Sequence, residues 1–179
     1  ELMRPAFGAA ALDGYIATAI DVYNQRFTQW QQRGQVPFKA EVRRLMADAA
    51  AKVFLGIDDP KEGAMLDEAT ADAWLAPQAV FKRTRWSRSW QRAMRGYDTL
   101  WNALLPRVAA KRAGDGKDLF SWMARTTGHE QTSATGQPWL DDAALVRVLI
   151  SSMMAAFDTT SSGIANMAWL LAKYPQWQD

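Results

Sequence analysis

The chain has 179 residues, of which 49% are apolar and 22% charged, and it contains one histidine and no cysteine. This composition is typical of a folded globular chain and excludes disordered, collagen-like and low-complexity proteins. Without cysteine the chain has no disulfides, cysteine nucleophiles or thiolate metal sites, and His129 alone cannot form a multi-histidine site. We therefore expect no metal ligand in the chain. The net charge of +2 does not by itself indicate a nucleic-acid partner.

The first three predicted elements are helices, because alanine occurs 31 times against 8 valines and 5 isoleucines. The first ends near Gly34, and we expect its apolar stripe to face the core: Leu12, Ile16, Ala19, Tyr23, Phe27 and Trp30. The second follows Pro37 and ends at Gly56, with a stripe of Phe38, Val42, Leu45, Ala49 and Val53. A weaker third helix covers residues 61–76. No segment shows the alternation that predicts a strand.

The next segment mixes cations with aromatic residues, since six Lys or Arg residues between positions 77 and 95 alternate with Phe81, Trp86 and Trp90. Such a mixture can indicate a nucleic-acid groove. The stripe of Trp86, Trp90, Met94, Tyr97, Trp101, Leu104 and Val108 instead favours a helix whose arginines are solvated. We therefore expect no nucleic-acid partner. Pro106 should interrupt this helix, and the glycines at 114 and 116 should end it.

The rest of the chain divides into a short helix, a polar loop and one long helix. The short helix covers residues 118–123, and residues 126–138 are predicted as a loop, where we assign His129 no role. The long helix begins at Asp141 and Asp142 and ends before Pro175. Asp158 is its only charged residue between Val148 and Ala172. We expect a buried core helix rather than a membrane span, because the polar residues 158–163 divide it into two short apolar arms.

Two interpretations of Asp158 are open from the residues alone. A carboxylate inside a helix core is costly unless it is paired or solvated, and such local conflicts tend to occur at functional sites. Alternatively, one helix ends at Phe157 and a second begins with Asp158 or Thr159 as its N-cap. A capping box would favour the second interpretation, but Ser161 and Ser162 stand where it needs Glu or Gln.

The run Ala155-Ala156-Phe157-Asp158-Thr159-Thr160 resembles the oxygen-activation motif of cytochrome P450 enzymes. Further stretches are similar to the same family in the same order: residues 2–7 to the end of helix C, 49–56 to helix E, 85 onward to helix G after the F–G loop, and 118–121 to helix H. The resemblance covers residues 1–179 as one central domain fragment. It implies a mainly α, P450-like partial fold around one long buried helix. One departure is Ala156, where the family usually has glycine.

The resemblance implies haem-thiolate monooxygenation, in which O2 and two electrons place one oxygen atom in a C–H bond of a small apolar substrate. It implies that Ala155, Ala156 and Thr159 lie over the haem. Thr159 would donate a hydrogen bond to dioxygen, and Asp158 would relay protons through a water held in a widened turn of the helix. Ser151, Met154 and Phe157 are the candidates for substrate contact.

The remaining expectations concern the complete protein. The resemblance implies haem b with its cysteine ligand outside this chain, and NAD(P)H electrons delivered by a ferredoxin or flavoprotein reductase. The fragment alone should be inactive. We expect a cytoplasmic enzyme without a membrane partner. The alternative is a non-catalytic helical ligand-binding or regulatory domain, in which Asp158 only caps a helix.

Overall fold

The computed structural model describes residues 5–83, 86–129 and 141–178, and these residues form helices and no strand. The α-helices are α1 (Ala9–Arg33), α2 (Phe38–Leu55), α3 (Pro60–Ala73), α4 (Leu75–Gln78), α5 (Arg88–Leu104), α6 (Val108–Ala113), α7 (Leu119–His129) and α8 (Asp142–Lys173). Three short 3-10 helices are η1 (Pro5–Phe7), η2 (Leu105–Arg107) and η3 (Pro175–Trp177). The predicted mainly α fold is confirmed.

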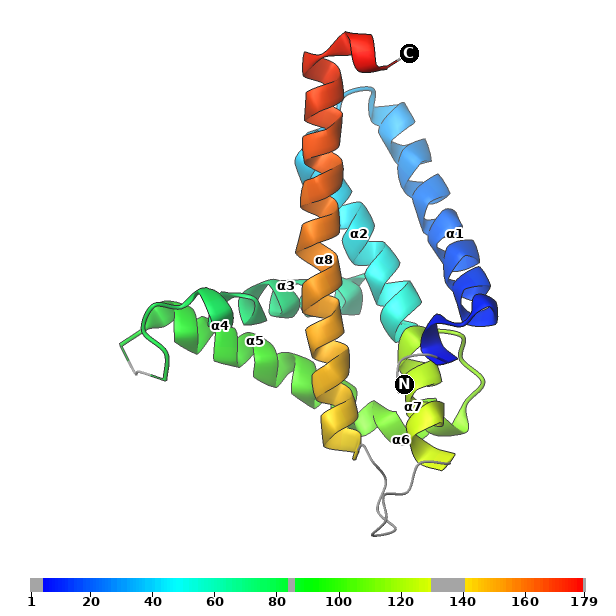
Figure 1. Cartoon of the computed structure of the whole chain (residues 1–179), viewed down its shortest axis with the longest axis vertical. Helices are drawn as coiled ribbons and strands as arrows, with labels where there is room; N and C mark the ends of the chain where they lie inside the picture. Colours follow the sequence, from blue (N-terminus) through cyan, green and yellow to red (C-terminus); the bar gives the residue numbers. More distant parts are fainter. Residues whose placement is uncertain (1–4, 84–85, 130–140, 179) are drawn as a thin grey trace.

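Helix α8 runs along the long axis of the molecule, and the other helices pack around its first half and middle (Figure 1). Helices α2, α3, α5 and α7 contact it, α1 packs on α2, and α3 pairs with α5. The main core combines side chains of all these elements around Phe120, Leu100 and Leu149, which are fully buried. Burial of this apolar surface is the main force that holds the helices together.

Most predicted helix ends are confirmed by the capping contacts. Gly56 ends α2 with a left-handed φ of 61°, which glycine adopts without steric cost. Pro106 lies in η2 and separates α5 from α6, because proline cannot complete the helical hydrogen bonds. The Asp141 carboxylate accepts a 2.6 Å hydrogen bond from the Ala144 amide and begins α8. The predicted loop is wrong over residues 126–129, which extend α7; residues 130–138 lie outside the described part.

The predicted core stripe of α1 is only partly correct. Tyr23 and Trp30 pack against a core cluster that includes Leu45 and Ala49 of α2. Ile16 is instead 56% exposed and Phe27 45% exposed, and the fully buried residues of α1 are Ala11, Tyr15 and Val22. Sequence spacing shows that a face is apolar; it does not show which neighbour covers it.

The stripe predicted from Trp86 to Val108 is confirmed at Leu104 and Val108, which are fully buried. Its aromatic part is displaced, because a glycine sets the packing of α5 against α3. The face against α3 is centred on Ala93, Gly96 and Leu100, and a side-chain carbon at Gly96 would lie 2.5 Å from the Ala69 carbonyl oxygen. The two backbones therefore touch at this point. Trp86 precedes α5 and is 92% exposed, while the other predicted aromatic residues lie half-buried beside this contact.

A buried ion pair joins three helices, α2, α6 and α7, at the end of α2. Lys111 of α6 lies 3.0 Å from the Asp118 carboxylate and donates a 2.6 Å hydrogen bond to the Leu55 carbonyl. Asp118 also accepts hydrogen bonds from the Ser121 amide and hydroxyl and so caps α7. Gly56 is required beside this pair, because a side-chain carbon there would lie 2.7 Å from both charged groups.

Glu41 connects the end of α1 to the start of α2. Its carboxylate is buried and accepts 2.9 Å hydrogen bonds from the Trp30 indole and the Arg33 guanidinium. The Arg33 hydrogen bond is the largest of the effects that hold the pKa of Glu41 below its usual value, and burial opposes it. The carboxylate is thus kept charged where the chain reverses between the two helices.

The substitution Gly96→Ala should weaken the α3–α5 contact, because the added methyl group meets backbone atoms that cannot rotate away. We expect a loss of about 2 kcal/mol or more in the free energy of unfolding, measured by denaturant titration. Gly14→Ala is the matched control. The nearest atom there is 3.9 Å away, so the same change should stabilise α1 by about 0.5–1 kcal/mol. Equal effects at both positions would contradict the close backbone contact.

Tyr15 should make stability fall in strong alkali. Its hydroxyl donates a 2.9 Å hydrogen bond to the Ala6 carbonyl, and burial, aided by the nearby Asp118 charge, raises its pKa to about 12 from 10.0. A raised pKa favours the neutral phenol in the folded state, so this contribution is complete below pH 10 and is lost as the pH rises towards 12. Unfolding measured against pH should show this fall, and Tyr15→Phe should remove that part of it.

Candidate functional site

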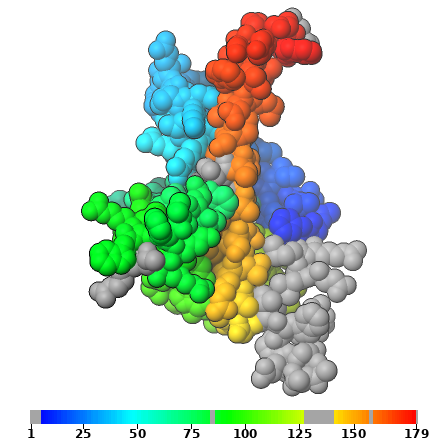
Figure 2. Space-filling view, turned by 60° about the vertical axis from the view of Figure 1, so that its left-hand side comes forward, coloured from blue at the N-terminus to red at the C-terminus, as the bar shows by residue number. Residues whose placement is uncertain are grey.

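The site expected from the sequence lies in the middle of α8, at the point where most side chains of this helix change from buried to exposed. The first half of the helix belongs to the core, with Leu145, Leu149 and Met153 each at most 4% exposed. In the second half Met167 is 61% exposed and Trp169 58% exposed. Figure 2 shows the last turns of α8 projecting beyond the α3–α5 pair. In the described residues the predicted burial of this helix therefore holds for its first half, whereas its second half is mostly exposed and Ser161 is its buried residue.

Helix α8 continues through the polar residues 158–163 without a break. The backbone is α-helical from Asp142 to Lys173, so the alternative of two helices with an N-cap at Asp158 or Thr159 is wrong. The expected widened turn is also not observed, since this stretch is α-helical throughout. The side chains of Phe157 and Asp158 lie outside the described part of the structure, and their predicted roles stay predictions.

Four small residues form an exposed row along one face of α8. Ser151, Ala155, Thr159 and Gly163 follow one another at four-residue steps, and each is exposed. Nothing lies within 4 Å of the position that a side chain at Gly163 would take. We call these four residues the small-residue row. It extends over about 18 Å of helix and has no side chain larger than threonine.

Among the predicted site residues, the structure places Ser151, Ala155 and Thr159 together on this row. Ala156 is half-buried beside it, and Met154 packs partly against the main core, so both lie at its edge. Sequence reasoning missed Gly163. Its position four residues after Thr159 was the available signal, because that spacing continues the same helix face.

The Thr159 hydroxyl donates a 2.8 Å hydrogen bond to the carbonyl oxygen of Ala155. A hydroxyl carries a single proton to donate and can also accept hydrogen bonds. In this arrangement the Thr159 hydroxyl can therefore accept a hydrogen bond from a molecule on the open side of the row. Donation to another molecule would require the side chain to leave the Ala155 carbonyl.

On a different side of α8, Ser161 is 6% exposed and lines a cavity of about 700 Å³ with Ser162 and the start of α2. Lys39 and Arg43 are the cations of this cavity, and Arg43 also lies 3.6 Å from the Asp67 carboxylate. Burial is the largest effect on Asp67 and raises its pKa, and the Arg43 charge opposes the shift. The sequence analysis did not single out these residues.

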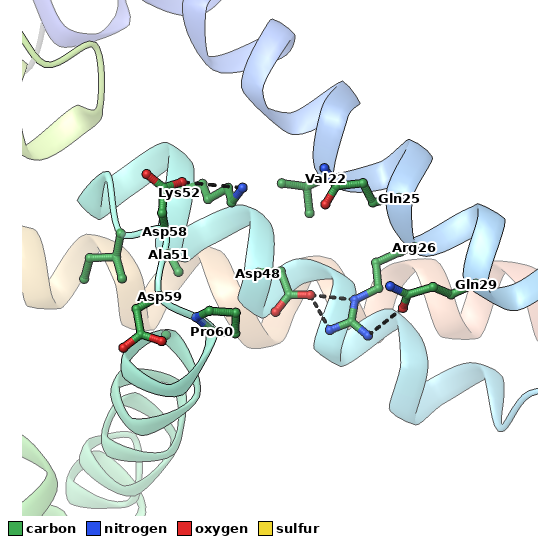
Figure 3. Close-up of a pocket in the computed structure, with 12 residues that line it drawn as sticks. Val22, Gln25, Arg26, Gln29, Asp48, Ala51, Lys52, Asp58, Asp59 and Pro60 are labelled. Atoms are coloured by element: carbon green, nitrogen blue, oxygen red, sulfur yellow. Dashed lines mark hydrogen bonds and ion pairs between the residues drawn. The ribbon is translucent and has the colours of Figure 1, made fainter.

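A second polar cavity, of about 480 Å³, lies between α1, α2 and the start of α3 (Figure 3). Arg26 of α1 bonds the Asp48 carboxylate of α2 at 2.6 Å through its Nε atom, and Lys52 lies 3.5 Å from Asp58. Asp59 accepts a hydrogen bond from the Lys61 amide and caps α3. The charged groups of this cavity thus bond to one another or to backbone, and they connect the three helices.

Helix α8 is also long and apolar enough to cross a membrane, and 31% of its most apolar stretch is buried inside the structure. A core helix of a water-soluble protein can have the same length and apolarity, so these two properties do not distinguish a core helix from a membrane span.

Comparison with known proteins supports the predicted resemblance. No family model matches the chain. A Mycobacterium tuberculosis protein provisionally named cytochrome P450 136 is 29% identical over 99% of this chain and 36% of its own length. A second, provisionally named cytochrome P450 135A1, is 27% identical over 99% of this chain and 40% of its own length. The chain thus spans little more than a third of these relatives.

The fold agrees with the sequence similarity. The structure of a retinoic acid-bound cyanobacterial CYP120A1 matches 98% of this chain and 39% of its own length, with a TM-score of 0.76 at 18% identity. The chain is therefore a helical assembly with the cytochrome P450 fold. It resembles one continuous part of a cytochrome P450, and the family resemblance predicted from the sequence is confirmed.

Proposed function

We propose that this chain is the central helical domain segment of a haem-thiolate monooxygenase of the cytochrome P450 family. The small-residue row carries this proposal, because it is an open, flat face in the middle of a continuous helix. The similarity to cytochromes P450 over 99% of the chain supports it independently. The alternative, a non-catalytic domain in which Asp158 caps a helix, loses its main support because the helix does not begin there.

The residues present fit a haem on this face. A flat macrocycle can approach a helix only where the side chains are short, and the row offers serine, alanine, threonine and glycine. We infer that Ala155 and Thr159, with Ala156 at the edge, would hold haem b against α8. When bound, the haem would supply the chemistry of oxygen activation, with its cysteine ligand from a segment outside these residues.

The role of Thr159 follows from its hydroxyl. Beside the haem it can accept a hydrogen bond while it is bonded to Ala155, and it can donate one to dioxygen after it rotates away. Asp158, one residue earlier on the same helix, is the group that would hold and pass on the protons. Its backbone position is fixed by a regular helix, so proton delivery would need a water within hydrogen-bond reach of its carboxyl.

Ser151 and Met154 are the proposed substrate contacts of this chain, together with Phe157. Ser151 is one turn from Ala155 on the row, and the thioether of Met154 provides an adaptable apolar surface at its edge. A small apolar molecule is the substrate class that this lining favours. Electrons would come from NAD(P)H through a ferredoxin or flavoprotein reductase, in the cytoplasm.

Replacing Thr159 by alanine in the complete protein should uncouple oxygen use from product formation. Without the hydroxyl, the peroxide released per NAD(P)H consumed should rise severalfold, because a group that assists proton transfer is lost. Thr160→Ala is the matched control, because Thr160 is also exposed but lies about 100° around the helix from Thr159. Thr159→Ser should restore coupling. Unchanged coupling in Thr159→Ala would contradict the proposed role.

Replacing Ala155 by phenylalanine should lower the haem content of the purified protein, because the ring would occupy the row where the macrocycle lies. We expect a several-fold loss of Soret absorbance per protein while the far-ultraviolet circular dichroism is kept. Ala109→Phe, at an exposed position of α6, is the control and should keep its haem. Full haem content in Ala155→Phe would show that the haem does not lie on this face.

A further inference from the structure

Arg147 continues the small-residue row by one turn towards the start of α8. It lies four residues before Ser151, which is the same step that separates the members of the row. Its side chain is exposed and forms no ion pair within the described part of the chain. The other cation of this helix, Lys173, lies at its far end. A cation therefore stands at one end of the face to which we assign the substrate.

Two aromatic side chains of α5 support the Arg147 guanidinium. The end of α5 lies beside the first turns of α8 (Figure 1). The central carbon of the guanidinium is 5.4 Å from the centre of the Trp101 ring, which is a cation–π contact between the two helices. The Tyr97 ring stacks on Trp101, with the ring centres 6.1 Å apart. Both rings are half-buried against the main core, so the guanidinium rests on a fixed surface.

A stacked guanidinium keeps its hydrogen-bonding edge available. Its N–H groups lie in the plane of the group, so contact of one face with Trp101 uses none of them. The Ser151 hydroxyl, one turn farther along the row, is exposed as well. Side chains four residues apart on a helix have their Cβ atoms about 5–6 Å apart, so Arg147 and Ser151 can both donate to one small anionic group.

The nearest acidic residue of α8 does not neutralise this cation. Asp142 is bonded to Arg112 at 2.5 Å, in an ion pair that joins α8 to α6. Arg147 thus keeps its charge and its donors for a partner beyond the described residues. An arginine that is only solvated has no need of an aromatic support beside a site for a ligand.

We propose that Arg147 and Ser151 bind a carboxylate at one end of an otherwise apolar substrate. The guanidinium would donate paired hydrogen bonds to the two carboxylate oxygens, because its planar fork matches a carboxylate, and the Ser151 hydroxyl would donate another. Arg147 is then a specificity-determining residue. The inference rests on the proposed monooxygenase function and narrows its substrate from a small apolar molecule to one with an acidic end.

The row also determines which part of such a substrate is oxidised. Ala155 and Thr159 are two and three four-residue steps after Arg147, which places them about 12 Å and about 18 Å farther along the helix axis. The thioether of Met154 lies between as an apolar surface. A substrate held by its carboxylate at Arg147 therefore reaches Thr159 only with carbon atoms remote from the acid.

The test is equilibrium dialysis of the complete, haem-loaded protein with dodecanoic acid and with dodecan-1-ol, which has the same chain without the charge. The unmodified protein should bind the acid more tightly than the alcohol. Arg147→Gln should weaken binding of the acid by about tenfold or more, as expected for loss of hydrogen bonds to a charged group, and leave the alcohol within about twofold. Arg147→Lys keeps the charge without the planar fork, so the acid should bind about threefold more weakly and the alcohol unchanged.

The matched control is Arg95→Gln, which removes the same charge from an exposed position of α5 and should keep the affinity for the acid within about twofold. Three results would each overturn the inference: an unmodified protein without preference for the acid, equal losses for both probes in the Arg147 variants, or a loss in the control as large as in Arg147→Gln. Circular dichroism checks folding, and the Lys variant decides if the Gln variant does not fold.

The haem spectrum separates this inference from the proposed function. A complete protein that binds no haem would contradict both. A protein that binds haem and loses coupling in Thr159→Ala, but shows no acid preference that depends on Arg147, would contradict this inference alone.

Discussion

The structure depends on the burial of the first half of α8. Leu145, Leu149 and Met153 are inside the core that α2, α3, α5 and α7 build, and each other helix is placed by its contact with this segment or with a neighbour of it. Fully burying one such side chain contributes about 1.5–3 kcal/mol relative to leaving it in water. The later turns of α8 continue the same helix beyond this core, and the exposed small-residue row extends along them.

The ion pair of Lys111 and Asp118 fixes a second part of the structure. It joins the end of α2 to α6 and α7, and it leaves space only for glycine at position 56. Removing one partner would leave a charge mostly buried and unpaired, which is costly, so the pair specifies how these ends meet. Together with the buried Glu41 at the other end of α2, it fixes the helix on which α8 rests.

Much of this could be predicted from the sequence, and the failures have identifiable causes. Helix ends depend on local chemistry, which is why Gly56, Pro106 and Asp141 were correct indicators. The buried faces of α1 and α5 were predicted only in part, because a periodicity pattern gives most weight to large residues. Gly96 lets the backbones of α3 and α5 approach, and Ala11 is 2% exposed; the small size of both hides them from such a pattern.

The same holds for the candidate site. The spacing of Ser151, Ala155 and Thr159 predicted a common face, and helix geometry alone makes this true. What the residues could not tell is that α8 is continuous and that most of its second half is exposed. The exposure depends on which other helices cover α8, a matter of tertiary contact. The hydrogen bond from Thr159 to Ala155 is local, because a threonine in a helix can bond to the carbonyl four residues earlier.

The backbone contact at Gly96 has a mechanical consequence. Because the backbones of α3 and α5 touch at Gly96, sliding one helix past the other at this point would cost the packing of both. The residues 56–59 that precede α3 and the proline turn η2 are the connections that join this pair to the other helices.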